Sequence, residues 1–208
     1  VSKKYAKEIA KDIDLKVSHD SKAHDPWLYE SEDTTHYSIA DKEGNMVAIT
    51  KTVNGLFGNS VVVDGYGFVM NNEMDDFVLG AGHPNSVAPS KTPLSSMSPT
   101  IVLKDGKPFM VLGSPGATKI ISTVSQVISR VIDHKMGMQD AIDAPRLWDN
   151  TSNKINVETR IPDETLKRLE AMGHKTNKTS EWDRGMGSVQ GVLYKADGTL
   201  EGGADPRR

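Results

Sequence analysis

The feature that most constrains the fold is a long amphipathic pattern between residues 117 and 135. Its apolar side chains recur at intervals of three, four, seven and eight positions, which places them on one face of a helix. These side chains are Ile120, Ile121, Val124, Val127, Ile128, Val131 and Ile132. The pattern predicts a helix whose apolar face is buried against a sheet formed by the rest of the chain.

The first part of that sheet is predicted by two pairs of alternating segments. Residues 36–40 and 46–53 alternate on either side of a polar turn, so they predict a hairpin. Residues 100–103 and 109–112 flank an Asp-Gly turn and predict a second hairpin. Because hairpins join antiparallel strands, the sheet should be largely antiparallel.

The remaining segments predict shorter elements. Residues 60–70 are β-branched and apolar around two glycines, which predicts a strand with a bend. Residues 16–33 are polar and acidic with Pro26 among them, which predicts an extended or loop segment. The other predicted elements are strands at 155–157 and 189–194 and helices at 1–13, 138–144 and 162–172. Strands thus precede and follow the helices, and this order predicts an α+β fold.

Charge and composition exclude several classes of function. The 208 residues have a formal charge of −3, which gives neither a basic nucleic-acid footprint nor a polybasic membrane-binding segment. No apolar run approaches the ~20 residues that span a bilayer. Because the chain has no cysteine, thiol nucleophiles, disulfides and cysteine zinc sites are excluded. The histidines lack metal-site spacing, and neither a phosphate-binding loop nor a GxSxG motif is present. We therefore expect neither a metal nor a cofactor.

The start of the chain predicts a processed or partial polypeptide. It begins Val1-Ser2-Lys3-Lys4, its first methionine is Met46, and no signal peptide is visible. The length by itself predicts one domain or slightly more, at about 150 residues per domain.

Several stretches with unusual composition follow one another in a definite order. They read DTTH at 33–36, NNEMDDF at 71–77, PLSSMSPT at 93–100, GSPG at 113–116 and DAPR at 143–146. Together they resemble the motifs of the γ-glutamyltransferase (γ-glutamyltranspeptidase) family, and the resemblance covers nearly all of residues 34–208. It implies an α+β N-terminal-nucleophile hydrolase fold, an αββα sandwich in which two stacked antiparallel sheets lie between helical layers. That fold would be incomplete without the family's large subunit.

The resemblance implies that Thr34 is a nucleophile. A threonine hydroxyl needs a base, and an N-terminal threonine carries one in its α-amine, whose unperturbed pKa is about 7.7–8.0. An internal Thr34 has an amide instead, whose lone pair is delocalised. The resemblance therefore implies autocatalytic cleavage between Asp33 and Thr34. Residues 1–33 would be the tail of a large subunit and 34–208 the small catalytic subunit of a heterodimer.

Recognition of a γ-glutamyl group requires anions for its α-ammonium and donors for its α-carboxylate. The resemblance assigns Glu73 and Asp76 to the ammonium and Ser95 and Ser96 to the carboxylate. An arginine from the large subunit would add to the carboxylate site. The substrates implied are glutathione, γ-glutamyl peptides or poly-γ-glutamate, with water, an amino acid or a peptide as the acceptor.

Four more residues are assigned through the resemblance. Thr52 resembles a threonine that hydrogen-bonds the nucleophile, and Asn54 an asparagine that helps to hold the substrate carboxylate. Gly116 and Ala117 stand where two glycines supply the N–H groups that bind the oxyanion. Alanine keeps the N–H but disfavours positive φ, so either Ala117 has negative φ or the oxyanion hole is altered.

A second departure concerns residues 78–92. Family members with a lid carry a longer insertion here, including an aromatic residue that covers the pocket. The shorter segment predicts a lidless, more open cleft that admits large or polymeric γ-glutamyl substrates.

Two other readings stay open at this point. One is an acylase of the same superfamily, of the cephalosporin or glutaryl type, although an acylase substrate has no ammonium to pair with Glu73 and Asp76. The other is an unprocessed, non-catalytic fragment that acts as a binding or structural module. The family resemblance implies a secreted, extracellular or periplasmic protein.

Overall fold

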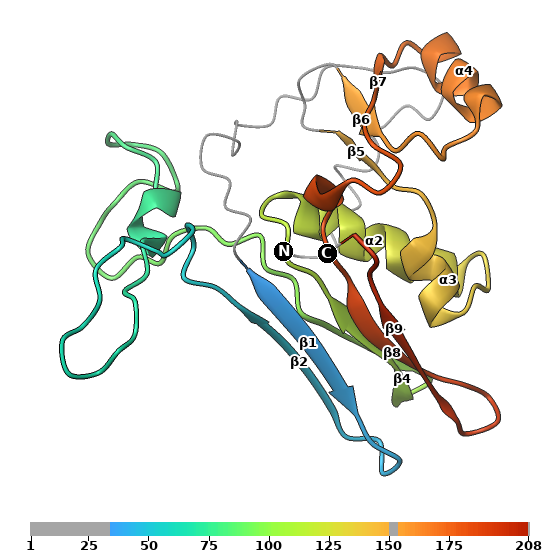
Figure 1. The fold of residues 1–208 in the computed structure, drawn as a ribbon, viewed down its shortest axis with the longest axis horizontal. Helices are drawn as coiled ribbons and strands as arrows, with labels where there is room; N and C mark the ends of the chain where they lie inside the picture. Colours follow the sequence, from blue (N-terminus) through green and yellow to red (C-terminus); the bar gives the residue numbers. More distant parts are fainter. Residues whose placement is uncertain (1–33, 150–153, 208) are drawn as a thin grey trace.

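The computed structural model describes residues 34–149 and 154–207 (Figure 1). The helix predicted over 1–13 and the extended segment predicted over 16–33 lie outside the described residues. No helix among those described is both long and apolar enough to cross a membrane.

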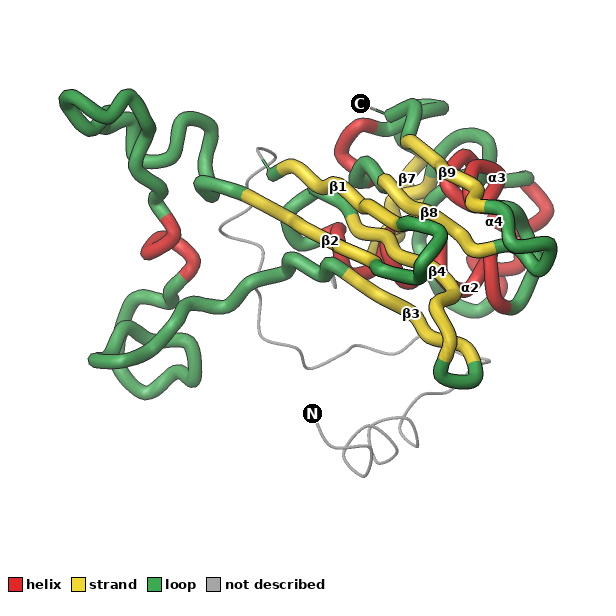
Figure 2. The backbone as a smooth tube through the Cα atoms, turned by 90° about the horizontal axis from the view of Figure 1, so that it is seen from below, coloured by secondary structure: helices red, strands yellow, loops and turns green. Residues whose placement is uncertain are grey.

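Two antiparallel sheets stack on each other. The first pairs β1 (Thr35–Ala40) with β2 (Met46–Lys51), which confirms the first predicted hairpin. The second has the order β3 (Thr100–Lys104), β4 (Lys107–Gly113), β8 (Gln190–Tyr194) and β9 (Leu200–Ala204), which confirms the second hairpin. Strand β1 lies against β4 and β8, as Figures 1 and 2 both show.

The two sheets are tied together by hydrogen bonds as well as by packing. The Ser38 hydroxyl donates to the Gln190 carbonyl at 3.1 Å, and the Tyr194 hydroxyl donates to the Asp41 carbonyl at 2.9 Å. The His36 imidazole is buried against Gly113, where an added Cβ would lie 2.3 Å from the ring. These contacts fix the start of β1, and thus Thr34, relative to β4.

The predicted amphipathic helix is confirmed as α2 (Lys119–Ile132). Together with α3 (Met138–Asp143), it covers the face of the four-stranded sheet that points away from β1 and β2. The main hydrophobic core lies between these helices and the sheet. Its buried members are Met110, Leu112, Ile120, Val124, Val127, Val131, Met138, Ala141, Ile142, Val189 and Leu193. Of the predicted apolar positions, Ile121 and Ile132 lie outside this core and are exposed.

A smaller unit contains β5 (Leu147–Asp149), β6 (Ile155–Val157), β7 (Thr176–Lys178) and α4 (Asp163–Ala171). Strand β6 pairs with β7 in parallel, which departs from the otherwise antiparallel pattern. Ile155, Val157, Ile161 and Leu166 form a core of their own.

Residues 54–96 form an arm that extends away from the stacked sheets (Figures 1 and 2). The arm contains the short 3-10 helix η3 (Glu73–Asp76). The bent strand predicted for residues 60–70 is wrong, because this segment is a loop closed by a single bridge between Val62 and Val69. Gly65 and Gly67 both have positive φ and turn the chain back, so that three backbone hydrogen bonds join residues 59–63 to residues 68–70 in place of one continuous strand.

The described residues thus form two sheets and one helical layer. The outer face of β1 and β2 lies opposite the stacked sheet and carries exposed apolar side chains. The helical layer expected on that side of an αββα sandwich is not among the described residues.

Candidate active site

Eight of the predicted site residues line one cavity between the arm and the stacked sheets. They are Thr34, Thr52, Asn54, Glu73, Asp76, Ser95, Ser96 and Ala117. Val78, Leu94, Met97, Thr118 and Ile120 complete its lining. These eight residues lie just before β1, just after β2, in η3, in the segment before β3 and in the loop before α2. The cavity therefore depends on the fold as a whole rather than on one loop.

Thr34 immediately precedes β1, and its side chain is 7% exposed. The threonine therefore stands directly before the first residue of β1, a strand whose register is fixed by six residue pairs with β2. A nucleophile needs such rigid support, because small displacements from productive geometry reduce the reaction rate strongly.

Thr52 and Asn54 form a tight turn after β2. The Thr52 hydroxyl oxygen accepts a 2.8 Å hydrogen bond from the Asn54 N–H, and Asn54 has φ +69°. The Asn54 amide nitrogen donates to Asp76 Oδ1 at 3.2 Å, which joins β2 to η3. Within the described part of the chain, Thr52 forms no hydrogen bond with Thr34. Its expected contact with the nucleophile therefore stays a prediction.

Glu73 and Asp76 present two carboxyl groups to the cavity from η3. Burial raises the pKa of Glu73, and the neighbouring Asp76 charge raises it further. Burial also raises the pKa of Asp76, although the hydrogen bond from Asn54 partly opposes this. Neither carboxylate forms an ion pair with another described residue. A cation entering the cavity would relieve their repulsion and favour their ionised forms.

Of the two serines, Ser96 connects the arm to the loop before α2, whereas Ser95 is bonded within its own segment. The Ser96 hydroxyl donates to the Ala117 carbonyl at 2.8 Å, and Ser95 Oγ accepts from the Met97 N–H at 3.3 Å. Both side chains line the cavity that the carboxylates face. A zwitterionic group could therefore contact acids on one wall and hydroxyl donors on another.

The loop before α2 has an unusual backbone conformation. Gly116 has φ +131° and Ala117 has φ +50°, so the alternative in which Ala117 has negative φ is wrong. A Cβ on Gly116 would lie 2.8 Å from Gly187 Cα, which explains why glycine occupies this position. Ala117 adopts a conformation that costs a non-glycine residue about 1–2 kcal/mol. The backbone here is held by its surroundings rather than by local preference.

A second cavity adjoins Thr34. Thr34 and Gly116 line it together with Pro115, Arg184, Gly185, Gly187, Ser188 and Arg207. The 3-10 helix η4 (Arg184–Met186) supplies one wall. Thr34 is thus shared by two cavities, one lined by Ala117 and the other by Gly116.

A buried ionic cluster lies behind this second cavity, and no role for it was predicted from the sequence. Arg146 pairs with Asp205, while Arg207 pairs with Asp205 at 3.1 Å and with Glu158 at 2.6 Å. All four side chains are fully buried. Burial alone raises the pKa of Glu158, but hydrogen bonds from Arg207 and from the Arg146 N–H hold it below the ordinary value. The DAPR and DPR stretches were the available signal, since buried arginines need paired acids.

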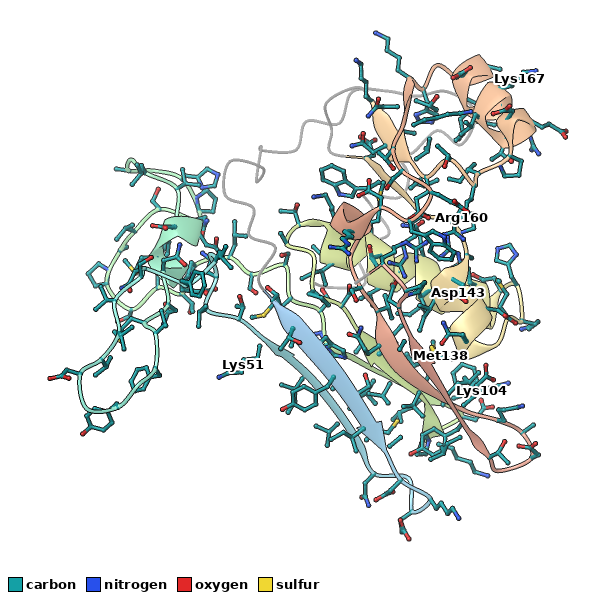
Figure 3. All side chains as sticks on the ribbon, in the orientation of Figure 1. Lys51, Lys104, Met138, Asp143, Arg160 and Lys167 are labelled. Carbon is teal, nitrogen blue, oxygen red and sulfur yellow. The ribbon has the colours of Figure 1, made fainter. Side chains whose placement is uncertain are left out.

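The cluster supports the loop that carries Gly116. Arg146 Nη1 donates to the Met186 and Gly187 carbonyls, both at 3.1 Å. Gly187 in turn packs on Gly116. At the edge of the cluster, Arg160 donates at 2.7 Å to the carbonyl of Asp143, the last residue of α3, and Figure 3 labels both residues.

His36 lies close to Thr34 in sequence but serves packing. Its ring nitrogens hydrogen-bond Thr50 Oγ1 at 2.8 Å and Ser38 Oγ at 2.9 Å. Burial lowers the pKa of His36 to about 4, so the ring is neutral at pH 7. Within residues 34–149 and 154–207, no group of three or more His, Asp or Glu side chains is arranged to hold a metal ion.

The chain is similar to known proteins over its whole length. A sequence model of the family described as gamma-glutamyltranspeptidase matches residues 1–208. The glutathione hydrolase proenzyme of Escherichia coli (strain K12) is 43% identical over 222 residues, covering 99% of this chain and 37% of that protein. The acylase ACY 1 proenzyme of Pseudomonas sp. (strain SE83) is 40% identical over 175 residues, covering 84% of this chain and 31% of that protein. The chain therefore spans about a third of the length of these relatives.

A solved structure is similar as well. A mutant of the gamma-glutamyltranspeptidase of Helicobacter pylori matches with a TM-score of 0.74 and 42% identity. The match covers 84% of this chain and 100% of that chain.

Proposed function

The chain belongs to the gamma-glutamyltranspeptidase family, and its stacked sheets are part of that family's α+β N-terminal-nucleophile hydrolase fold. From this membership we propose that residues 34–208 are the catalytic subunit of a γ-glutamyl hydrolase and transpeptidase whose nucleophile is Thr34. The observation that carries the proposal is the cavity in which Thr34 meets two unpaired carboxylates and two serines.

The first step is cleavage of the Asp33–Thr34 bond. The Thr34 hydroxyl attacks the Asp33 carbonyl carbon, the C–N bond breaks, and the nitrogen takes up a proton to become the Thr34 α-amine. Water then hydrolyses the resulting ester and releases the Asp33 carboxylate and the Thr34 hydroxyl. Only after this step does Thr34 carry its own base.

Turnover follows the same chemistry on a γ-glutamyl substrate. The α-amine of Thr34 accepts the hydroxyl proton as Oγ attacks the γ-carbonyl carbon. The backbone N–H groups of Gly116 and Ala117 stabilise the oxyanion. The leaving amine takes the proton from the α-ammonium, and a γ-glutamyl ester of Thr34 remains. Water or an acceptor amine then resolves the ester.

Substrate recognition divides between the two walls of the cavity. Glu73 and Asp76 bind the α-ammonium, while Ser95 and Ser96 donate to the α-carboxylate once the Ser96 hydroxyl has released the Ala117 carbonyl. The raised pKa values of the two acids show that each carboxylate would gain from a cationic partner in the cavity. Asn54 holds Asp76 in place and contributes to the carboxylate site.

We place the subunit boundary at Asp33–Thr34, with residues 1–33 as the tail of the large subunit. The match with the H. pylori chain supports this placement. That whole chain is covered by 84% of the present chain, and residues 34–208 make up the same 84%. The outer face of β1 and β2 supports a covering subunit. Its four exposed apolar side chains form directly opposed pairs, Tyr37 with Ile49 and Ile39 with Val47.

The main competing function is that of an acylase, since one relative is the acylase ACY 1 proenzyme. Two substrates that differ only in the α-ammonium distinguish the functions: γ-glutamyl p-nitroanilide and glutaryl p-nitroanilide. We expect the full-length protein to prefer the γ-glutamyl anilide by about tenfold or more, and Glu73→Gln to reduce this preference. A preference for the glutaryl anilide would support the acylase instead.

The short segment 78–92 bears on substrate size. We propose that it leaves the cleft open to poly-γ-glutamate as well as to glutathione. Hydrolysis of glutathione much faster than of poly-γ-glutamate would count against this extension and leave the reaction type unaffected.

A further inference from the structure

The cavity on the second side of Thr34 has a chemical character different from that of the first. The first cavity contains Glu73 and Asp76, whereas the charged residues among the described lining of the second are Arg184 and Arg207. The two cavities share Thr34 and are divided by the Gly116–Ala117 backbone, each lined by one of these residues.

The presence of a cavity on each side of Thr34 matters for the groups around the reacting carbon of a γ-glutamyl substrate. The reacting carbon carries the Thr34 oxygen, the oxyanion, the glutamyl chain and the amine that leaves or attacks. When the glutamyl chain occupies the acid-lined cavity, the amine must lie on the other side of the reacting carbon. The second cavity is the space that adjoins Thr34 on a different side.

The two arginines of this cavity are not equivalent. The Arg207 side chain is fully buried, and Glu158 and Asp205 neutralise its charge. Arg184 is exposed, and its guanidinium forms no hydrogen bond or ion pair with any other residue that the structure describes. Arg184 is therefore the available cation in the lining.

The backbone that carries Arg184 is well held. Asp183 Oδ1 caps η4 by accepting from the Gly185 N–H at 2.8 Å. The Met186 carbonyl accepts from Thr123 Oγ1 at 2.8 Å and from Arg146 Nη1 at 3.1 Å. This support fixes the point from which the Arg184 side chain extends, and its planar guanidinium can bind a carboxylate through two hydrogen bonds.

We propose that this cavity is the leaving-group and acceptor site, and that Arg184 binds the carboxylate of an incoming or departing amino acid or peptide. The inference rests on the proposed function and adds a specificity-determining residue to it. It predicts a preference for acceptors that carry a free carboxylate over the corresponding amides.

The test uses the full-length protein, γ-glutamyl p-nitroanilide as the donor, and glycylglycine or glycylglycinamide as the acceptor. In the unmodified protein, we expect the KM for glycylglycine to be about tenfold lower than that for the amide. Arg184→Ala should raise the glycylglycine KM to that of the amide and lower the ratio of transfer to hydrolysis. Arg184→Lys should restore part of the difference. Arg168→Ala, on the exposed surface of α4, is the matched control and should change neither KM.

The outcomes separate the inference from the proposed function. Equal KM values for both acceptors, or a glycylglycine KM that Arg184→Ala leaves unchanged, would overturn the acceptor site while donor hydrolysis persists. If the unmodified protein released no p-nitroaniline at all, the proposed function would fail, and the inference with it.

Discussion

Ala117 shows at the scale of one residue how the surrounding structure overrides local preference. Its φ of +50° is one that glycine adopts freely and alanine does not. The hydrogen bond from Ser96 and the packing of Gly116 on Gly187 hold the loop in place. The alanine therefore holds a left-handed conformation at a cost in conformational energy that glycine would not incur.

We expect Ala117→Gly to change kcat by less than about threefold, because the backbone N–H already has its left-handed orientation. Stability should stay equal or rise by about 1 kcal/mol, since relief of the strained φ is partly offset by the greater freedom of glycine in the unfolded chain. Anilide hydrolysis and urea unfolding measure the two effects. A tenfold rise in kcat would mean that alanine does distort the oxyanion hole.

The acids of η3 should give substrate binding a distinctive pH dependence. The pKa values of Glu73 and Asp76 are raised, so both acids take up protons at a higher pH than ordinary carboxyl groups. Affinity for the substrate ammonium should therefore fall as the pH is lowered towards these raised values. The measurement is KM for γ-glutamyl p-nitroanilide as a function of pH.

Glu73→Gln should raise KM at neutral pH by about tenfold or more. The further rise of KM at acidic pH should be smaller in this variant than in the unmodified protein. Glu164→Gln, an exposed acid on α4, serves as the control and should leave the profile unchanged. A profile for Glu73→Gln identical to that of the unmodified protein would remove this residue from the ammonium site.

At the scale of elements, the patterns with a strong period predicted the fold well. Residues 36–51 and 100–112 formed the predicted hairpins, and α2 and α4 lie where periodicity and capping placed them. Strands β5, β7 and β9 were not predicted. The first two contain only three residues each, and β9 is Leu-Glu-Gly-Gly-Ala, whose pairing with β8 depends on tertiary structure.

The candidate site was predicted unevenly for a similar reason. Residues within motifs, such as Glu73 and Ser95, could be assigned through the family resemblance, and the structure gathers them in one cavity. The pairing of Arg207 with Glu158 joins residues 49 positions apart, which no local pattern encodes. Arg184 belongs to no recognised motif, and its role is inferred from its place in the lining of the second cavity.

The buried cluster that joins α3, the smaller unit and the C-terminal segment should be essential to stability. Glu158→Gln removes one of the two anionic partners that the structure describes for the buried Arg207 guanidinium, which should cost about 3–5 kcal/mol. Because the pKa of Glu158 is lowered on folding, its contribution is present at neutral pH and is lost as the pH falls. Urea unfolding at pH 7 provides the measurement.

The matched control for this prediction is Asp163→Asn, which breaks the exposed ion pair with Lys178 and should have little effect. If both substitutions had the same small effect, the buried cluster would not be the support described for the Gly116 loop.

At the scale of the whole molecule, the described residues present one apolar sheet face without a covering layer. Ile39→Lys, on the outer face of β1, should weaken association of the two proposed subunits by about tenfold or more, because it places a charge on the exposed apolar face that the large subunit would cover. Ser125→Lys on the exposed side of α2 is the control. Co-elution of the subunits during size-exclusion chromatography in increasing urea reports the difference. Equal resistance of both variants would place the large subunit elsewhere.

The central claim is that this chain becomes a catalyst when Thr34 is released as an N-terminal residue. The direct measurement is the intact mass and N-terminal sequence of the purified full-length protein and of its Thr34→Ala variant, each assayed with γ-glutamyl p-nitroanilide. We predict two chains for the unmodified protein, one of them beginning at Thr34, together with hydrolysis of the anilide. The Thr34→Ala variant should remain a single inactive chain. Cleavage at another bond, or activity that survives in Thr34→Ala, would contradict this account.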